Sequence, residues 1–116
     1  MLEETINPSD GIYSATPDYV HGLCVHGAER MLFVSGTMGL DVDGNAPKSL
    51  NQQLELIWSN LRRILAEANM TTDNIVRVTS YLRDAAFAEK NQNARLAALG
   101  KRRVPTTAIV AETLTP

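Results

Sequence analysis

The run Met31-Leu32-Phe33-Val34 places four apolar side chains at consecutive positions. Successive side chains of a strand point to opposite faces, so a strand with this pattern needs cover on both faces. Residues 106–111, Thr-Thr-Ala-Ile-Val-Ala, repeat the pattern near the other end of the sequence. Two such strands constrain the fold of a 116-residue chain more than any other feature, because few other segments remain to cover them.

Length and composition set the outer limits. We expect residues 1–116 to form a single domain, since a chain of this length has no room for two cores. The chain contains 44% hydrophobic and 21% charged residues, a composition that excludes a disordered or fibrous protein. The formal net charge of −2 gives no general attraction for nucleic acid or an anionic membrane.

The sequence also argues against export and membrane insertion. The longest apolar runs fall far short of the about 20 residues that cross a bilayer, and the acidic N-terminus does not resemble a secretory signal. The lone cysteine, Cys24, cannot form an internal disulfide. We therefore expect a reducing, cytoplasmic location.

Two helices are predicted. Ser49, with Gln52 three residues later, is typical of a helix N-terminus. Apolar residues then recur at spacings of three and four, which predicts an amphipathic helix of about five turns. The stripe consists of Leu50, Leu54, Ile57, Leu61, Ile64 or Leu65, and Ala68. A second helix is expected from Asp84, as its cap, to Leu99, with Gly100 as its left-handed C-terminal residue.

The remaining segments predict strands. Residues 23–26 and 31–35 flank a four-residue turn and favour a hairpin, and further strands are expected at residues 75–82 and 106–111. Residues 1–18 suggest an irregular lead-in with one short strand near residues 11–14. The order predicts an α/β (α+β) fold with a single sheet and two helices on one face. The uncovered face predicts self-association.

Several segments together resemble one known family. Residues 31–37, Met-Leu-Phe-Val-Ser-Gly-Thr, resemble a strand motif of the Rid (YjgF-like) proteins. Residues 73–84 resemble the segment after the family's first helix, and Val104-Pro105 resembles the start of a late strand. The resemblance extends from about Tyr19 to Pro116 and implies a chorismate-mutase-like fold that assembles as a homotrimer.

The resemblance also implies an activity. Rid proteins of the best-known branch hydrolyse imines and enamines of 2-amino acids to 2-oxo acids and ammonia, at a site between subunits and without a metal or organic cofactor. Carried over residue by residue, the resemblance gives substrate-binding positions to Tyr19, Ser35, Asn91 and Thr107. It identifies no catalytic residue with certainty and no metal ligand.

Two departures from the family pattern bear on function. Thr107 stands where the family has an arginine that binds the substrate carboxylate through two bonds, and a hydroxyl cannot form that planar fork. Arg103 lies four residues upstream, about 13 Å along an extended strand, which is too far for a direct replacement. We therefore expect altered or weak activity on 2-imino acids. The family's last strand, which carries a glutamate, would follow Pro116, and we expect it to be missing here.

Other functions stay open at this stage. The main alternative is a non-catalytic trimer that binds a small ligand or acts like a chaperone. RNA cleavage is suggested by Lys101-Arg102-Arg103 and Arg62-Arg63, but these basic residues also suit a helix C-terminus and a solvated helix face. The sequence has no Gly-rich phosphate loop and few aromatic residues for base stacking, which argues against nucleic acid.

A short cluster of potential metal ligands lies at residues 21–26. His21, Cys24 and His26 form an H-x-x-C-x-H pattern. A closed zinc site needs four ligands, and on a strand Cys24 and His26 point to one face while His21 points nearer the other. A buried thiol beside a hydrogen-bonded histidine is the favoured interpretation.

Overall fold

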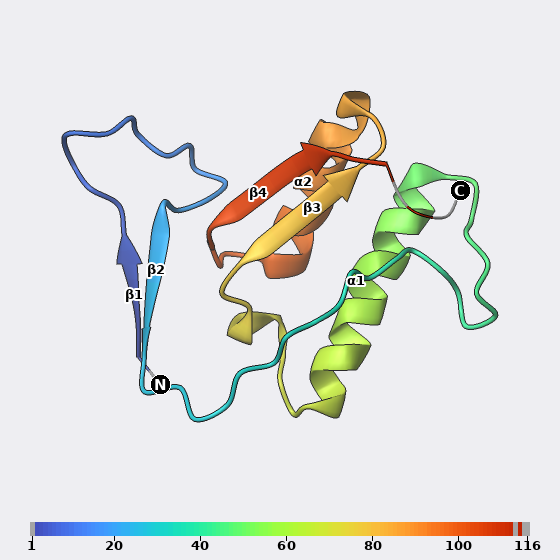
Figure 1. Ribbon diagram of the computed structural model, residues 1–116, viewed down its shortest axis with the longest axis horizontal. Helices are drawn as coiled ribbons and strands as arrows, with labels where there is room; N and C mark the ends of the chain where they lie inside the picture. The colour runs from blue at the N-terminus through green and yellow to red at the C-terminus, as the bar shows by residue number, and fades with distance from the viewer. Residues whose placement is uncertain (1, 113, 115–116) are drawn as a thin grey trace.

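The computed structural model describes residues 2–112 and 114, and it confirms an α+β fold (Figure 1). Its four strands are β1 (Leu2–Ile6), β2 (Gly22–His26), β3 (Val78–Leu82) and β4 (Thr106–Val110). Its helices are α1 (Leu50–Glu67) and α2 (Ala88–Leu99), with two 3₁₀ turns, η1 (Thr72–Asn74) and η2 (Ala85–Phe87). Strands β1 and β2 pair antiparallel, and β3 and β4 pair parallel through the α2 crossover.

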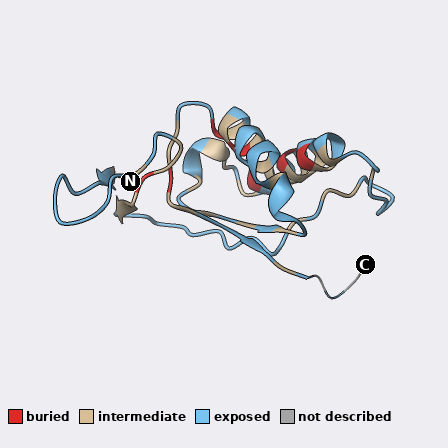
Figure 2. Cartoon of the chain, turned by 90° about the horizontal axis from the view of Figure 1, so that it is seen from above, coloured by how far each residue is buried: buried red, intermediate tan, exposed pale blue. Residues whose placement is uncertain are grey.

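Both helices lie on the same side of the β3–β4 sheet, with α2 behind the two strands and α1 beside them (Figure 1). The buried positions of the helices lie on the side toward the strands (Figure 2). The alternation along β3 agrees with this arrangement. Val78, Ser80 and Leu82 are half-buried, whereas Thr79 and Tyr81 are exposed. The opposite face, which we call the open face of the β3–β4 sheet, is not covered by the described residues.

The predicted helix ends are confirmed. The Ser49 hydroxyl accepts a hydrogen bond from the amide of Gln52 at 3.3 Å, which satisfies one free N–H at the start of α1. The Asp84 carboxylate accepts one from the amide of Ala86 at 2.9 Å and caps the η2 turn that leads into α2. Gly100 has a φ of 62° after α2, a conformation that favours glycine.

The core lies between the helices and the β3–β4 sheet. Trp58, Leu99 and Val104 form its centre, and Leu23 of β2 packs against them. Trp58 lies one turn after Leu54 on the same side of α1, although it was absent from the predicted stripe. The spacing of apolar residues takes no account of side-chain size. The large indole ring of Trp58 fills the contact between the layers.

The predicted strand at residues 31–35 is wrong, and so is the hairpin that contained it. In the described residues this segment has no strand partner, and the Phe33 side chain is 85% exposed. Strand β2 pairs instead with β1, in the register Leu2 with His26 and Ile6 with Gly22. Strand β1 thus replaces the short strand expected near residues 11–14. The described strands form two sheets rather than the predicted single sheet. The prediction failed because the partner of a strand is a distant segment of backbone, which local sequence does not specify.

The chain is open for its size. Its Cα radius of gyration is 15.3 Å, whereas a compact domain of this length has about 13 Å. Its accessible surface is 8504 Å², and a compact monomer of the same mass exposes about 6200 Å². Within the described residues, no helix combines the length and apolarity that a membrane span requires.

Two adjacent residues of α1 test the orientation of the helix. Leu65 is 6% exposed and Ile64 is 37% exposed. Leu65→Ala is expected to lower the free energy of unfolding by about 2–5 kcal/mol, because it leaves a cavity. Ile64→Ala removes a similar side chain from a more solvated position and should cost less. Urea unfolding of both variants at one protein concentration checks this, and equal losses would contradict the orientation.

Candidate functional site

A buried ion pair joins the N-terminal segment to α2. Arg95 is 6% exposed and donates to the Asp18 carboxylate at 3.0 Å and to the Asp18 carbonyl oxygen at 2.8 Å. The partners are 77 residues apart in sequence. A buried guanidinium needs a hydrogen-bonded counter-ion, so this contact fixes where the segment before β2 lies.

A second arginine fixes β1. Arg102 donates to both carboxylate oxygens of Glu3, at 2.8 and 2.7 Å, and its Nε donates to the carbonyl oxygen of Ile75 at 2.7 Å. This two-bond fork is the strongest geometry for such a pair. Strand β1 is therefore held beside the segment that leads into β3.

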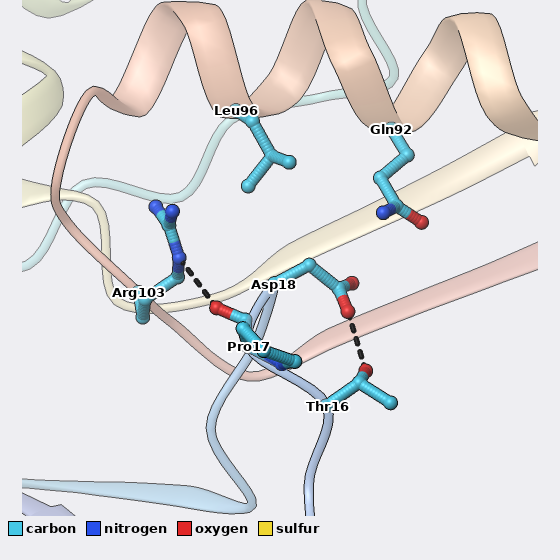
Figure 3. Close-up of a pocket in the computed structure, with 6 residues that line it drawn as sticks. All are labelled: Thr16, Pro17, Asp18, Gln92, Leu96 and Arg103. Carbon is cyan, nitrogen blue, oxygen red and sulfur yellow. Dashed lines mark hydrogen bonds between the residues drawn. The ribbon is translucent and has the colours of Figure 1, made fainter.

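A cavity of about 510 Å³ opens between the N-terminal segment and α2 (Figure 3). It is lined by Thr16, Pro17, Asp18, Gln92, Leu96 and Arg103. Arg103 is turned toward the loop, where its Nε donates to the Pro17 carbonyl oxygen at 2.8 Å and its Nη1 to the Gly100 carbonyl oxygen at 2.8 Å. The polar groups that bound the cavity are thus largely engaged with one another.

Two carboxyl groups have lowered pKa values. The Thr16 hydroxyl, which donates to Asp18, is the main cause of the low pKa of that carboxyl; burial opposes the shift, and Arg95 adds to it. The hydrogen bonds from Arg102 lower the pKa of Glu3. Both groups therefore stay ionised at neutral pH as structural anions, not as proton donors or acceptors for catalysis.

The four residues predicted to bind substrate lie on four different segments. Tyr19 is half-buried before β2, with its ring 5.7 Å from that of His21 in an edge-on arrangement. Ser35 is exposed in the extended segment between β2 and α1, and its carbonyl oxygen accepts a hydrogen bond from the Thr37 hydroxyl at 3.0 Å. Asn91 is half-buried on α2, one turn before Arg95.

Thr107 is exposed on the open face of the β3–β4 sheet, where its hydroxyl accepts a hydrogen bond from Nη2 of Arg77 at 3.3 Å. Among the described residues, no hydrogen bond joins any two of the four predicted side chains. Tyr19 and Asn91 lie on the two segments that the Asp18–Arg95 ion pair joins. The single chain does not gather all four residues into one pocket.

Sequence reasoning missed the residues that organise this region. Arg95 and Asp18 were not singled out, although Arg95 lies four residues after Asn91 on the side of α2 that faces inward. Arg77 was expected only as a strand residue. An arginine at an inward helix position is a usable signal for a buried partner, but the sequence does not say which acid supplies it.

The histidine–cysteine cluster has the geometry expected of one strand. The Cys24 sulfur lies 3.3 Å from Nε2 of His26, and the Glu4 carboxylate lies 3.7 Å from the same nitrogen. His21 instead places its Nε2 2.8 Å from the Tyr13 carbonyl oxygen. Within the residues described, no three histidine, cysteine or acidic side chains are arranged to hold a metal ion.

Comparison with known proteins gives consistent matches. The model of the family described as endoribonuclease L-PSP matches residues 12–116. The RutC family protein YjgH of Escherichia coli is 33% identical over 84 residues, which are 72% of this chain and 63% of that protein. The mitochondrial protein MMF1 of Saccharomyces cerevisiae is 36% identical over 66 residues, 55% of this chain and 46% of that protein. The matched regions therefore span less than two thirds of these relatives.

Solved structures share the fold. The Rid-family protein YyfB of Yersinia pestis superposes with a TM-score of 0.83 at 20% identity, over 100% of this chain and 90% of that one. RidA of the Antarctic bacterium Psychrobacter superposes with a TM-score of 0.67 at 17% identity, over 86% of each chain. At these identities the likeness establishes the architecture alone.

The lowered pKa values of Asp18 and Glu3 predict how stability depends on pH. A carboxyl whose folded pKa is lowered stabilises the fold fully above its unfolded pKa, about 3.9 for aspartate, and that stability is lost as the pH falls through the folded value. The difference in unfolding free energy between the wild type and Asp18→Asn should therefore shrink below about pH 4. Asp43→Asn, at an exposed loop position, is the control. Urea unfolding between pH 3 and 7 measures both, and the same pH dependence in the two variants would contradict the assignment.

Proposed function

The chain belongs to the endoribonuclease L-PSP family of Rid and YjgF-like proteins, and we propose that it is a cofactor-free hydrolytic deaminase of small imines and enamines. Water adds to the carbon of the C=N bond, the C–N bond then breaks, and ammonia leaves together with the carbonyl product. A reducing, cytoplasmic setting is part of this proposal and suits the free thiol of Cys24.

The observation that carries the proposal is the placement of the four predicted residues. Tyr19, Ser35, Asn91 and Thr107 lie on separate segments, and the face that carries Thr107 is open. We propose that a second copy of the chain completes a pocket built from them. This supports a site between subunits, in which backbone groups and the Ser35 hydroxyl position the substrate while Tyr19 and Asn91 line the pocket.

The exposed apolar surface supports self-association. The chain exposes about 2300 Å² more than a compact monomer of its mass, which exceeds the about 800 Å² that each partner buries in a standard interface. Much of the exposed apolar surface lies on the segment at residues 31–34 and on the open face, where Tyr81 is 64% and Ile109 is 47% exposed. We propose a homotrimer in which other copies cover these surfaces.

Thr107 sets the expected specificity. Replacing an arginine fork by one hydroxyl removes a charge-assisted interaction of about 1.5–3 kcal/mol, or about 10- to 150-fold in affinity. The site should therefore act weakly on simple 2-imino acids, or prefer substrates bound in another way.

The alternative functions have less support from the residues. RNA cleavage is named in the family description, but in this chain Arg102 is paired with Glu3 and Arg103 is bonded to backbone carbonyls. The guanidinium of Arg102 is thus already paired with an acid, and Nε and Nη1 of Arg103 are held by carbonyl oxygens. A non-catalytic trimer that binds a small ligand, or acts like a chaperone, differs from the enzyme only in lacking turnover.

The deaminase proposal predicts ammonia release from freshly generated iminopyruvate or 2-aminoacrylate. The rate should exceed that in buffer and remain below that of a relative with the arginine. A rate equal to buffer, with saturable ligand binding, would favour the non-catalytic alternative. A rate equal to that of the arginine-bearing relative would contradict the role given to Thr107.

Ser35→Ala should lower kcat/KM by about 2- to 10-fold, the effect of removing one neutral hydrogen bond to the substrate. Ser59→Ala deletes the same hydroxyl from an exposed position on α1 and is the matched control. Steady-state ammonia assays measure both variants. Equal rates for Ser35→Ala and Ser59→Ala would remove Ser35 from the site.

The assembly proposal predicts a light-scattering mass near three times that of one chain. Phe33→Glu should shift this mass toward the monomer, because it buries a charge in the proposed interface. Val42→Glu, at a fully exposed loop position, is the control and should leave the trimer intact. A wild-type mass near one chain would overturn the proposal.

A further inference from the structure

The open face of the β3–β4 sheet presents an unusual combination of donors. Nη2 of Arg77 donates to the Thr107 hydroxyl at 3.3 Å across the two strands. Thr79 lies directly opposite Thr107 in the parallel register, on the same face. One guanidinium and two hydroxyls therefore share one exposed patch.

Arg77 differs from the three arginines that are paired with acids in the described part of the chain. Arg95 and Arg102 are bound to Asp18 and Glu3, and Arg63 is paired with Glu67. Within residues 2–112, the only hydrogen bond of the Arg77 side chain is to a neutral hydroxyl. A guanidinium has five N–H donors, so most of its capacity remains for a ligand.

The rest of the face defines the shape of that ligand. Beyond Thr79 and Thr107, the next pair in the register is Tyr81 with Ile109, both largely exposed. Positions on one face of a strand are about 7 Å apart. The strand positions of this face carry no acidic residue. The patch thus offers a cationic end and an apolar end, separated by the length of a few carbon atoms.

We propose that Arg77, with the Thr107 hydroxyl, binds the carboxylate of a small anion whose apolar part lies toward Tyr81 and Ile109. This inference rests on the proposed function, because it makes Arg77 the residue that selects a carboxylate-bearing substrate. The guanidinium comes from Arg77, the residue just before β3, rather than from position 107 on β4. The substrate is therefore held at a shifted position, which accounts for an altered specificity without loss of anion binding.

Binding of pyruvate tests the inference independently of catalysis. In calorimetric titrations of the assembled protein, Arg77→Gln should weaken pyruvate binding by about 10- to 150-fold, the effect of removing a charged hydrogen-bonding partner. Arg77→Lys keeps the charge without the planar fork and should bind with intermediate affinity. Arg62→Gln removes the same charge from an exposed position on α1 and is the control. Pyruvate affinity in Arg77→Gln equal to that of Arg62→Gln would overturn the inference.

Kinetics separate this inference from the proposed function. With a 2-imino acid, Arg77→Gln should raise KM by at least about 10-fold while kcat changes little, and hydrolysis of an imine without a carboxylate should be unaffected. Arg77-dependent pyruvate binding in a wild type that releases no ammonia would support the anion site and reject the deaminase. Ammonia release by the wild type, with the same KM and kcat in Arg77→Gln, would support the deaminase and reject the anion site. Light scattering and circular dichroism establish that the Arg77→Gln and Arg77→Lys variants are folded and assembled like the wild type.

Discussion

The buried pair of Arg95 and Asp18 is the interaction on which the arrangement of the two sheets depends. It joins positions 77 residues apart, with the guanidinium almost inaccessible to water. Removing either partner would leave the other charge buried alone, a situation that costs about 3–5 kcal/mol. Arg102 reinforces it by binding Glu3, so the N-terminal hairpin is attached to the helical layer mainly by side chains from α2 and the turn after it. Backbone pairing acts only within each sheet.

This arrangement leaves arginines in two different environments. Arg95 and Arg102 are enclosed and bound to carboxylates, and they build the scaffold. Arg77 lies on the opposite layer, exposed and bonded to a hydroxyl. The same side-chain chemistry therefore serves structure in one place and, by our proposal, recognition in the other. The difference is whether an acid within the chain already occupies the guanidinium.

The open face links the fold to the proposed function. A sheet covered by helices on one side leaves Tyr81, Ile109 and Thr107 in contact with solvent, together with the apolar segment at residues 31–34. Burial of such a surface is favourable at about 25 cal/mol per Å² of apolar area, so association of copies is the natural way to cover it. A pocket formed there would combine polar groups from more than one chain, which suits a small polar substrate.

The sequence by itself determined the local elements. The spacing of Leu54, Leu61 and Leu65 specified α1, Ser49 and Asp84 marked the starts of helical segments, and Gly100 marked the end of α2, because these signals act within a few residues. The resemblance carried by short motifs also led to the correct family.

Only the tertiary structure decided the pairings. It joined β2 to β1 instead of residues 31–35, placed Trp58 in the core, and brought Arg95 to Asp18 and Arg77 to Thr107. Each of these contacts except that of Trp58 joins a strand or side chain to a partner at least 16 residues away in sequence. Ladder partners and counter-ions are chosen by which groups meet in space, so no pattern local to either partner identifies the other.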